Sequence, residues 1–328
     1  MKIISDRMNI VYATDEKFAE ILSVSMESLL EHNSSVVIYI LDNGICEESV
    51  KRLKRQADKY DAEMHIMKLK KLKEYAGREL LCQTKITTTT YFRLFLSEIL
   101  PDDVEKVLYI DCDTLICDDL SELYYLNLNN TCGNVAEPTA PLMKKKINIK
   151  PDDTYFNAGI MLIDLKRWRE ERINKKFVDY IEEMEGKISF EDQGVINHVL
   201  NGKIDVLPVR YNVETQYFDF GYDGFQIMKN DKSRYAEKEV IDAMNNPAII
   251  HFTNSFVSER PWVNGSKHKY LEKWIKYKEK TEWKNSESWS SNKDFVRRIS
   301  KIIYSILPRK AGLKFIYLVN GILRAFME

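Results

Sequence analysis

Residues 107–113 read VLYIDCD, four apolar residues followed by two aspartates that flank a cysteine. The apolar run is typical of a buried strand, and side chains at positions i and i+2 of an extended chain face the same side. We therefore expect Asp111 and Asp113 to point together from the carboxyl end of the strand while Cys112 faces away. Two hard oxygen ligands placed in this way suit Mg²⁺ or Mn²⁺, whose remaining positions go to water and substrate phosphates. The alternative is a solvated turn in which an aspartate caps the following helix.

Apolar runs upstream of this strand alternate with amphipathic segments. Residues 10–13, 36–41 and 64–67 are short apolar runs, and residues 18–30 and 47–60 between them have helical periodicity. Strands separated by helices imply crossover connections and a mostly parallel sheet, in which ligands bind beyond the carboxyl ends of the strands. The predicted fold class is therefore α/β.

Downstream of residue 113 the pattern is less regular. We predict strands at residues 159–165 and 248–252, and helices at residues 90–100, 168–184 and 190–200. Residues 211–235 are rich in Tyr, Phe, Gly and Asp but keep no period, so we expect a loop there.

The composition excludes several classes of protein. The 328 residues carry 49 Lys and Arg against 50 Asp and Glu, so no excess of positive charge indicates a partner nucleic acid. Five cysteines form no CxxC pair, which favours reduced thiols in a cytoplasmic protein over a zinc site. The N-terminus has no apolar core of signal-peptide length, so we expect no secretion. The longest apolar stretch near the other end, residues 315–323, is too short to span a bilayer.

Basic charge is concentrated in the C-terminal segment. Residues 293–328 contain eight Lys or Arg and two Asp or Glu, a net charge of +6, which leaves −7 for the rest of the chain. Apolar residues from 295 to 306 follow a helical stripe opposite basic ones. The segment is either a pair of helices packed on the core or an interfacial anchor for anionic lipid. We favour the anchor, which would place the protein peripherally on the inner face of the cell membrane.

Four further positions carry polar groups near expected strand or helix ends. Asp15 either caps a helix that begins near residue 17 or accepts hydrogen bonds from a ribose or a base. His251 is either a core histidine or a third ligand for the cation. Asp192 and Gln193 either cap a helix or offer a carboxylate and an amide to a polar substrate. In residues 155–159 (YFNAG), Asn157 is followed by two small residues, which would let a ligand approach the backbone.

Together these features resemble the retaining glycosyltransferases of family 8, which include bacterial lipopolysaccharide α-galactosyl- and α-glucosyltransferases and glycogenin. The resemblance covers about residues 8–265, and its motifs agree in order and spacing. They are residues 13–15 (ATD), 89–93 (TTYFR), 107–113 (VLYIDCD), 155–159 (YFNAG) and 192–193 (DQ), and His251 followed by residues 260–262 (RPW).

The resemblance implies a GT-A fold, a Rossmann-like mixed sheet that binds a nucleotide sugar and is flanked by helices. It implies a transferase domain at residues 1–265, followed by a helical basic extension at 266–328. Asp111, Asp113 and His251 resemble the ligands of Mn²⁺ or Mg²⁺, and Gln193 and Asp192 resemble the catalytic residues. The residues that the resemblance assigns to the UDP-hexose donor are Ala13, Asp15, Arg93, Asp111, Cys112, Asp113, Asn157, Ala158, Asp192, Gln193, His251 and Arg260.

The implied activity is metal-dependent transfer of galactose or glucose from a UDP-sugar to a glycan or glycolipid acceptor in cell-surface glycan synthesis. Because an amide is a poor nucleophile, Gln193 favours front-face attack with retention, and Asp192 is the reserve nucleophile. Two features depart from the family: Arg260 stands where a Lys is common, and residues 252–259 form a longer segment without glycine. The alternatives are a nucleotide-sugar hydrolase, a non-catalytic membrane-peripheral binding module and a self-glucosylating protein similar to glycogenin.

Overall fold

The computed structural model describes residues 7–80, 88–291 and 295–327. Within these residues, a seven-stranded sheet has the order β3-β2-β1-β4-β7-β6-β8. Its strands are β1 (Met8–Thr14), β2 (Val36–Asp42), β3 (Glu63–Lys68), β4 (Lys106–Ile110), β6 (Cys132–Ala136), β7 (Phe156–Asp164) and β8 (Ile204–Val206). Cys82, one of the five cysteines predicted to be reduced thiols, lies outside the described residues.

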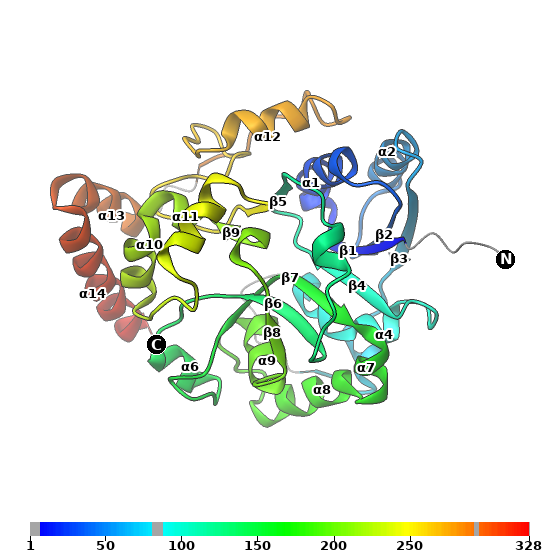
Figure 1. Ribbon diagram of the computed structural model, residues 1–328, viewed down its shortest axis with the longest axis horizontal. Helices are drawn as coiled ribbons and strands as arrows, with labels where there is room; N and C mark the ends of the chain where they lie inside the picture. Colours follow the sequence, from blue (N-terminus) through cyan, green and yellow to red (C-terminus); the bar gives the residue numbers. More distant parts are fainter. Residues whose placement is uncertain (1–6, 81–87, 292–294, 328) are drawn as a thin grey trace.

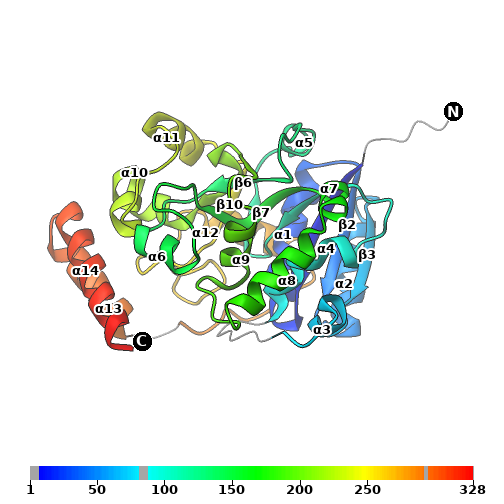
Figure 2. The same cartoon turned by 90° about the horizontal axis from the view of Figure 1, so that it is seen from below.

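One half of the sheet is parallel, as the alternation of strands and helices predicts. β1 pairs in parallel with β2 and β4, and β2 pairs in parallel with β3. The crossovers are α1 (Ala19–His32) and α2 (Glu47–Asp58), on the opposite face of the sheet from α7 (Leu165–Glu170), α8 (Ile173–Glu183) and α9 (Glu191–Val199) (Figures 1 and 2). β7 runs antiparallel to both β4 and β6, so the sheet is mixed and the predicted α/β class is confirmed.

A second sheet of three short strands places a late strand of the chain beside the residues that follow Asp113. Its order is β5-β10-β9, with β5 at Thr114–Ile116, β9 at Val213–Glu214 and β10 at Ile249–His251. The predicted strand at residues 248–252 is β10, and its register pairs His251 with Thr114. The pairing therefore carries His251 next to the pair of aspartates that precedes β5.

Three predicted segments differ from the structure. The expected helix at 168–184 is divided into α7 and α8, because Arg172 adopts a left-handed conformation with φ 51°. Residues 90–100 form the 3₁₀ helix η2 (Thr88–Phe95) and a single turn, α4 (Leu96–Ile99). The expected loop at 211–235 is wrong, since α10 occupies Thr215–Lys229. Its kink at Gly221, with φ 71° and ψ −178°, interrupts the apolar period that would have indicated a helix.

The remaining elements are short or lie toward the C-terminus. They are η1 (Glu16–Phe18), α3 (Leu72–Ala76), α5 (Ser121–Tyr124), α6 (Pro141–Lys146), η3 (Val209–Tyr211), α11 (Glu237–Asn245), α12 (Leu271–Lys278), α13 (Phe295–Ile306) and α14 (Arg309–Met327). Trp274 of α12 is buried in a cluster with Val24 of α1, so residues after 265 contribute to the packed core.

α13 and α14 form a hairpin beside α10 at one end of the molecule (Figures 1 and 2). Leu313 and Ile316 of α14 are buried. α14 approaches α10 at Gly224, where an added Cβ would lie 2.9 Å from a Leu313 methyl group. One face of the hairpin is therefore packed on the core. In the described part of the chain, no helix combines the length and apolar character that crossing a membrane requires.

Candidate active site

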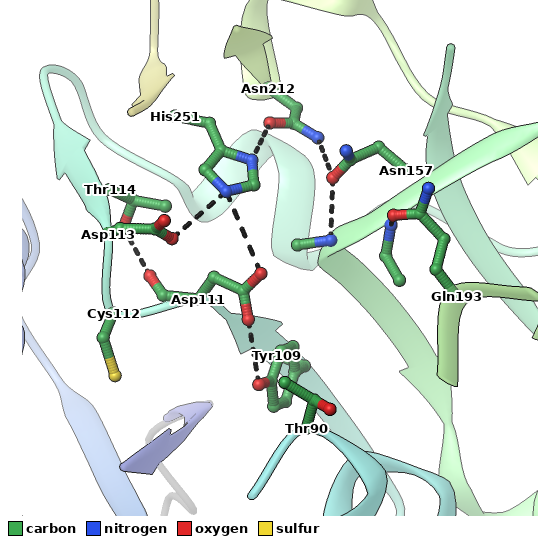
Figure 3. Close-up of polar contacts among 12 residues, drawn as sticks. Thr90, Tyr109, Asp111, Cys112, Asp113, Thr114, Asn157, Gln193, Asn212 and His251 are labelled. Carbon is green, nitrogen blue, oxygen red and sulfur yellow. Dashed lines mark hydrogen bonds and ion pairs between the residues drawn. The ribbon is translucent and has the colours of Figure 1, made fainter. Parts of the chain in front are cut away.

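Asp111 and Asp113 follow β4 and point into the same space, while Cys112 turns away between them (Figure 3). The Cys112 thiol donates to the carbonyl oxygen of Ala13, 3.2 Å away on the neighbouring strand β1. The ligand atoms of Asp111, Asp113 and His251 all lie within 4.8 Å of one another. The structure thus brings together the three residues that the sequence predicts as metal ligands, because the strand alternation and the β5–β10 pairing converge at one edge.

Hydrogen bonds on its far side fix the orientation of His251. Its Nδ1 lies 3.0 Å from the side-chain oxygen of Asn212, which can only accept, so Nδ1 carries the proton. Nε2 faces Asp113, 3.2 Å away, and Asp111, 3.9 Å away, so it can give a lone pair to a cation there only when it is unprotonated. The Asn212 amide is itself oriented, because its nitrogen donates to Asn157 at 2.9 Å. A neutral imidazole held in one tautomer is the form that ligates a cation.

Electrostatics at this cluster keep the Asp113 carboxylate ionised. Burial raises the pKa of Asp113, but His251 and Arg260 outweigh it and lower the pKa to about 2. For His251, burial lowers the pKa and the carboxylates raise it, with a net upward shift. The space beside Gly159, where small residues were expected to admit a ligand, is filled by His251 and Asp111, since a Cβ there would lie 2.4 Å from the His251 ring and 2.9 Å from an Asp111 oxygen. The donor set and its surroundings fit a divalent cation of the Mg²⁺ or Mn²⁺ type.

Arg93 joins the aspartate pair to α9. Its buried guanidinium lies 3.0 Å from Asp111 and 2.9 Å from Asp192, and donates to the carbonyl oxygen of Ala158 at 2.6 Å. Burial raises the pKa of Asp192 to about 6 despite the opposing effect of Arg93. Asp192 is thus a carboxyl group poised to change its protonation near neutral pH.

Gln193 is held by contacts on both ends of its amide. Its oxygen accepts from the Ala158 backbone at 3.0 Å, and its nitrogen donates to the Tyr155 hydroxyl at 2.9 Å. The turn that presents it is strained, since Phe190 and Glu191 have φ values of 67° and 47°. Left-handed conformations of such residues concentrate at functional sites.

A cavity of about 440 Å³ is lined by most of the residues predicted to bind the donor. Its lining includes Ala13, Asp15, Arg93, Asp111, Cys112, Asp113, His251 and Arg260. Arg260 lies 3.1 Å from Asp113, and its Nε is buried without an acceptor among the described residues. Asp15 caps η1 by accepting from the Phe18 backbone at 3.1 Å, so the capping interpretation also holds for it.

Asn157, Ala158, Asp192 and Gln193 are not part of this lining. Asn157 and Gln193 instead contact Glu137 and Tyr155, which line a second cavity of about 970 Å³. The Asn157 amide donates to Glu137 at 3.1 Å, and Glu137 forms an ion pair with Lys229 of α10. Burial and the nearby Glu137 raise the pKa of Glu214 to about 7.

The sequence reasoning missed Asn212 and Glu137. Asn212 lies in the segment interpreted as a loop, where no pattern marks it. Glu137 directly follows β6, a strand that was not predicted, so the argument from strand ends that selected Asp111 did not reach it.

An open mixed sheet with this cluster at the carboxyl ends of its strands defines an α/β enzyme of the glycosyltransferase class. The chain belongs to glycosyl transferase family 8, whose family model matches residues 9–265. The predicted family and the GT-A fold are therefore confirmed.

Relatives share most of the chain at low identity. General stress protein A of Bacillus subtilis is 28% identical over 84% of this chain and 94% of its own length. Lipopolysaccharide 1,2-glucosyltransferase of Escherichia coli is 24% identical over 79% of this chain and 73% of its own. The crystal structure of the galactosyltransferase LgtC with donor and acceptor sugar analogues is 25% identical. It covers 84% of this chain and 96% of its own, with a TM-score of 0.68. The chain spans only 35% of a longer relative, glycosyltransferase GlyA of Streptococcus pneumoniae.

Proposed function

We propose that this glycosyltransferase is a divalent-metal-dependent, retaining hexosyltransferase that moves galactose or glucose from a UDP-sugar to a glycan or glycolipid acceptor. The observation that carries the proposal is the cluster of Asp111, Asp113 and His251 at one side of a cavity that Arg260 also lines. Two carboxylates, one imidazole and one guanidinium are suited to a diphosphate bound together with a cation.

Asp111, Asp113 and His251 would hold the cation, which supplies Lewis-acid stabilisation of the departing UDP. Arg260 places a second positive charge there, because its side chain lines the same cavity and is 26% exposed, and a guanidinium suits diphosphate oxygens. Because these charges stabilise the leaving group, the proposal needs no separate acid on it. Ala13 and Asp15, at the far end of β1, would contact the uridine.

On the sugar side, Arg93, Asn157, Ala158, Asp192 and Gln193 would form the pocket of the transferred hexose. Arg93 keeps one Asp192 oxygen in an ion pair at 2.9 Å, which orients the carboxylate toward binding rather than attack. Gln193 offers an amide that can support positive charge on the sugar without forming a bond to it. We therefore favour front-face attack, in which the acceptor hydroxyl approaches from the side of the departing UDP.

We place the acceptor in the cavity of about 970 Å³, because Glu137 and Tyr155 line it and both contact Gln193. Lys310 and Lys314 of α14 line the same cavity, so an acceptor would leave it along the C-terminal hairpin. The hairpin would contact an anionic membrane surface, which favours the inner face of the cell membrane, where such lipids are enriched. This arrangement would suit a glycolipid acceptor.

The metal cluster is tested by UDP binding in the presence and absence of Mn²⁺. Asp111→Asn or Asp113→Asn should abolish the Mn²⁺-dependent part of UDP affinity, because each replacement removes an anionic ligand of the proposed cation. Each also removes the charge of a largely buried ion pair, so the melting temperature should fall and circular dichroism checks that the variant is folded. Asp103→Asn, at an exposed carboxylate, is the matched control. Unchanged Mn²⁺-dependent UDP affinity in either site variant would remove that residue from the proposed metal site.

The competing functions separate in a panel of UDP-sugars with and without added glycan. UDP release that requires an acceptor supports transfer, whereas equal release without one supports a hydrolase. A hexose mass increment on the intact protein would indicate self-glycosylation. Binding of a UDP-sugar with no release under any condition would support a non-catalytic module.

A further inference from the structure

The segment that carries Arg260 has no regular secondary structure of its own. Residues 253–261, here called the Arg260 loop, connect the end of β10 to the buried Trp262. His251 at one end and Arg260 near the other both contact Asp113, so the loop closes over one side of the proposed donor site. Its conformation therefore depends on the elements packed against it.

Helix α13 holds the outer side of the Arg260 loop. The Arg297 guanidinium lies 2.6 Å from a Glu259 carboxylate oxygen and donates to the carbonyl oxygen of Ser258 at 2.8 Å. The other Glu259 oxygen accepts from the hydroxyl of Ser291 at 3.2 Å. The side chains of Arg297 and Glu259 are only 20% and 11% exposed, so this is a largely desolvated ion pair.

Helix α10 holds the inner side, and α13 is joined to it. The Asp219 carboxylate of α10 accepts from the backbone of Ser258 at 3.2 Å and from its hydroxyl at 2.6 Å. The Phe256 ring packs against Phe220 of α10 and Tyr304 of α13, with centroids 5.1 and 5.7 Å away. The Tyr304 hydroxyl donates to the Asp219 carbonyl oxygen at 3.1 Å. Residues 255–259 are thus clamped between two helices.

We propose that Arg297 is a positioning residue for glycosyl transfer, which fixes Glu259 so that the next residue, Arg260, keeps its guanidinium beside Asp113. The inference rests on the proposed donor site. The C-terminal hairpin would then contribute to donor binding, although no residue of α13 lines the cavity of about 440 Å³. A tail that sequence analysis separates from the transferase domain would then determine how well the diphosphate is held.

The test is a double-mutant cycle on UDP affinity with Mn²⁺. Arg297→Met should weaken UDP binding about tenfold, because Glu259 is left buried without its partner and the loop relaxes. Arg298→Met, at the exposed neighbouring position on the same helix, should leave UDP affinity unchanged. In an Arg260→Met background, Arg297→Met should cost nothing further, since residues that act through one another are not additive.

Two further measurements separate positioning from general loosening of the fold. Uridine lacks the diphosphate that Arg260 would hold, so Arg297→Met should leave uridine affinity unchanged. Tyr304→Phe removes one hydroxyl and no charge, and should reproduce a smaller loss of UDP affinity, again absent without Arg260. The reversed pair Glu259→Arg with Arg297→Glu should recover part of the UDP affinity that either single change loses, because it restores the ion pair but not the hydrogen bond to the Ser258 carbonyl oxygen.

An equal loss with and without Arg260, or a parallel loss of uridine affinity, would overturn the role of Arg297. The proposed function fails separately: if Arg260→Met leaves UDP affinity at the wild-type value, Arg260 is not part of the donor site. If Arg260→Met weakens UDP binding and both Arg297→Met and Tyr304→Phe do not, the donor site stands and the positioning proposal falls.

Discussion

Gln193 lines neither of the two cavities, but both ends of its amide are hydrogen-bonded to neighbours. The oxygen accepts from Ala158 at 3.0 Å, and the nitrogen contacts Tyr155 at 2.9 Å and Glu137 at 3.5 Å. These contacts orient the amide without involving the Asp111 and Asp113 cluster. A role in stabilising charge on the sugar is therefore separable from a role in holding UDP.

Replacement of Gln193 should reduce turnover and spare UDP affinity. Losing one group that stabilises developing charge costs about 10²–10³-fold in turnover, which is our expectation for Gln193→Ala. UDP affinity should remain nearly unchanged, because the predicted uridine and cation contacts lie elsewhere. Steady-state kinetics and UDP titration of the same preparation measure both quantities. An equal loss in both would show that Gln193 acts through the donor site as a whole.

The same position distinguishes the two retaining mechanisms. Gln193→Glu supplies a carboxylate, and if a double displacement operated there it would yield a hexosyl adduct on the peptide that contains residue 193. We expect no adduct on the wild-type protein. A stable hexose on wild-type Asp192, found by peptide mass spectrometry, would make Asp192 the nucleophile and exclude front-face attack.

Single residues of the site were predictable where a strand end exposed them. Asp111 and Asp113 follow an apolar run, so the period and position of the run sufficed, whereas for His251 the position left a core histidine open and the family resemblance indicated a ligand. Asn212, which holds the His251 tautomer, was not predictable, because its role depends on a hydrogen bond between residues 39 positions apart. The pairing of Arg93 with Asp192 likewise depends on how α9 packs against η2, which no local pattern encodes.

At the scale of elements, the junction between α10 and the segment before α12 is built around His268. Its Nδ1 accepts from the Tyr270 backbone at 3.1 Å, and its Nε2 lies 3.2 Å from the Thr215 hydroxyl at the start of α10. A ring that already accepts a backbone N–H at Nδ1 has no place for a second proton. Burial accordingly lowers the pKa of His268 to about 4.

This histidine predicts a loss of stability in mild acid. Its pKa in the folded protein lies below the ordinary value of 6.5, so the unfolded chain binds the extra proton first. The free energy of unfolding should fall as the pH drops from about 6.5 toward 4, by on the order of 3 kcal/mol over that range. Urea unfolding of His268→Gln at pH 7 and pH 5 should show a smaller difference than the wild type. His65→Gln, at a half-exposed strand position, is the control and should keep the wild-type difference in unfolding free energy. If His268→Gln also keeps the wild-type difference, His268 is not the group responsible for the loss of stability.

Elements were predictable where periodicity was uninterrupted. The strands of the parallel half and α1, α2 and α9 follow their apolar patterns. α10 was missed, since its kink at Gly221 resets the helical period within fifteen residues. The division of α7 from α8 depends on one left-handed residue, Arg172, which is not a type that usually marks a break.

At the scale of the whole molecule, the C-terminal hairpin has two different faces. The inner face packs on α10 through Leu313 and Ile316. The outer face exposes large apolar side chains: Phe295, Ile302, Ile306, Leu307, Phe315 and Leu318. Exposed basic residues of the same helices are Arg298, Lys301 and Arg309, whereas Lys310 and Lys314 line the cavity of about 970 Å³, and residues 295–319 include no acidic residue. An apolar face with basic neighbours is typical of a helix lying in a membrane interface.

The exposed face of the hairpin should bind anionic vesicles, and two of its residues should account for much of that affinity. Ile302 and Ile306 are 57% and 73% exposed and lie one helical turn apart on α13. Changing both to glutamate removes apolar area and adds charge that anionic headgroups repel, so binding to phosphatidylserine vesicles in a flotation assay should fall by at least about tenfold.

The control is the double variant Ile241→Glu with Val206→Glu, which changes exposed apolar positions on other elements and should bind vesicles as the wild type does. High salt should weaken wild-type binding, because part of it is electrostatic. UDP affinity of the hairpin variant should be preserved, since Arg297 and its contact with the Arg260 loop are intact. Equal vesicle binding by wild type and hairpin variant would show that this face serves another partner.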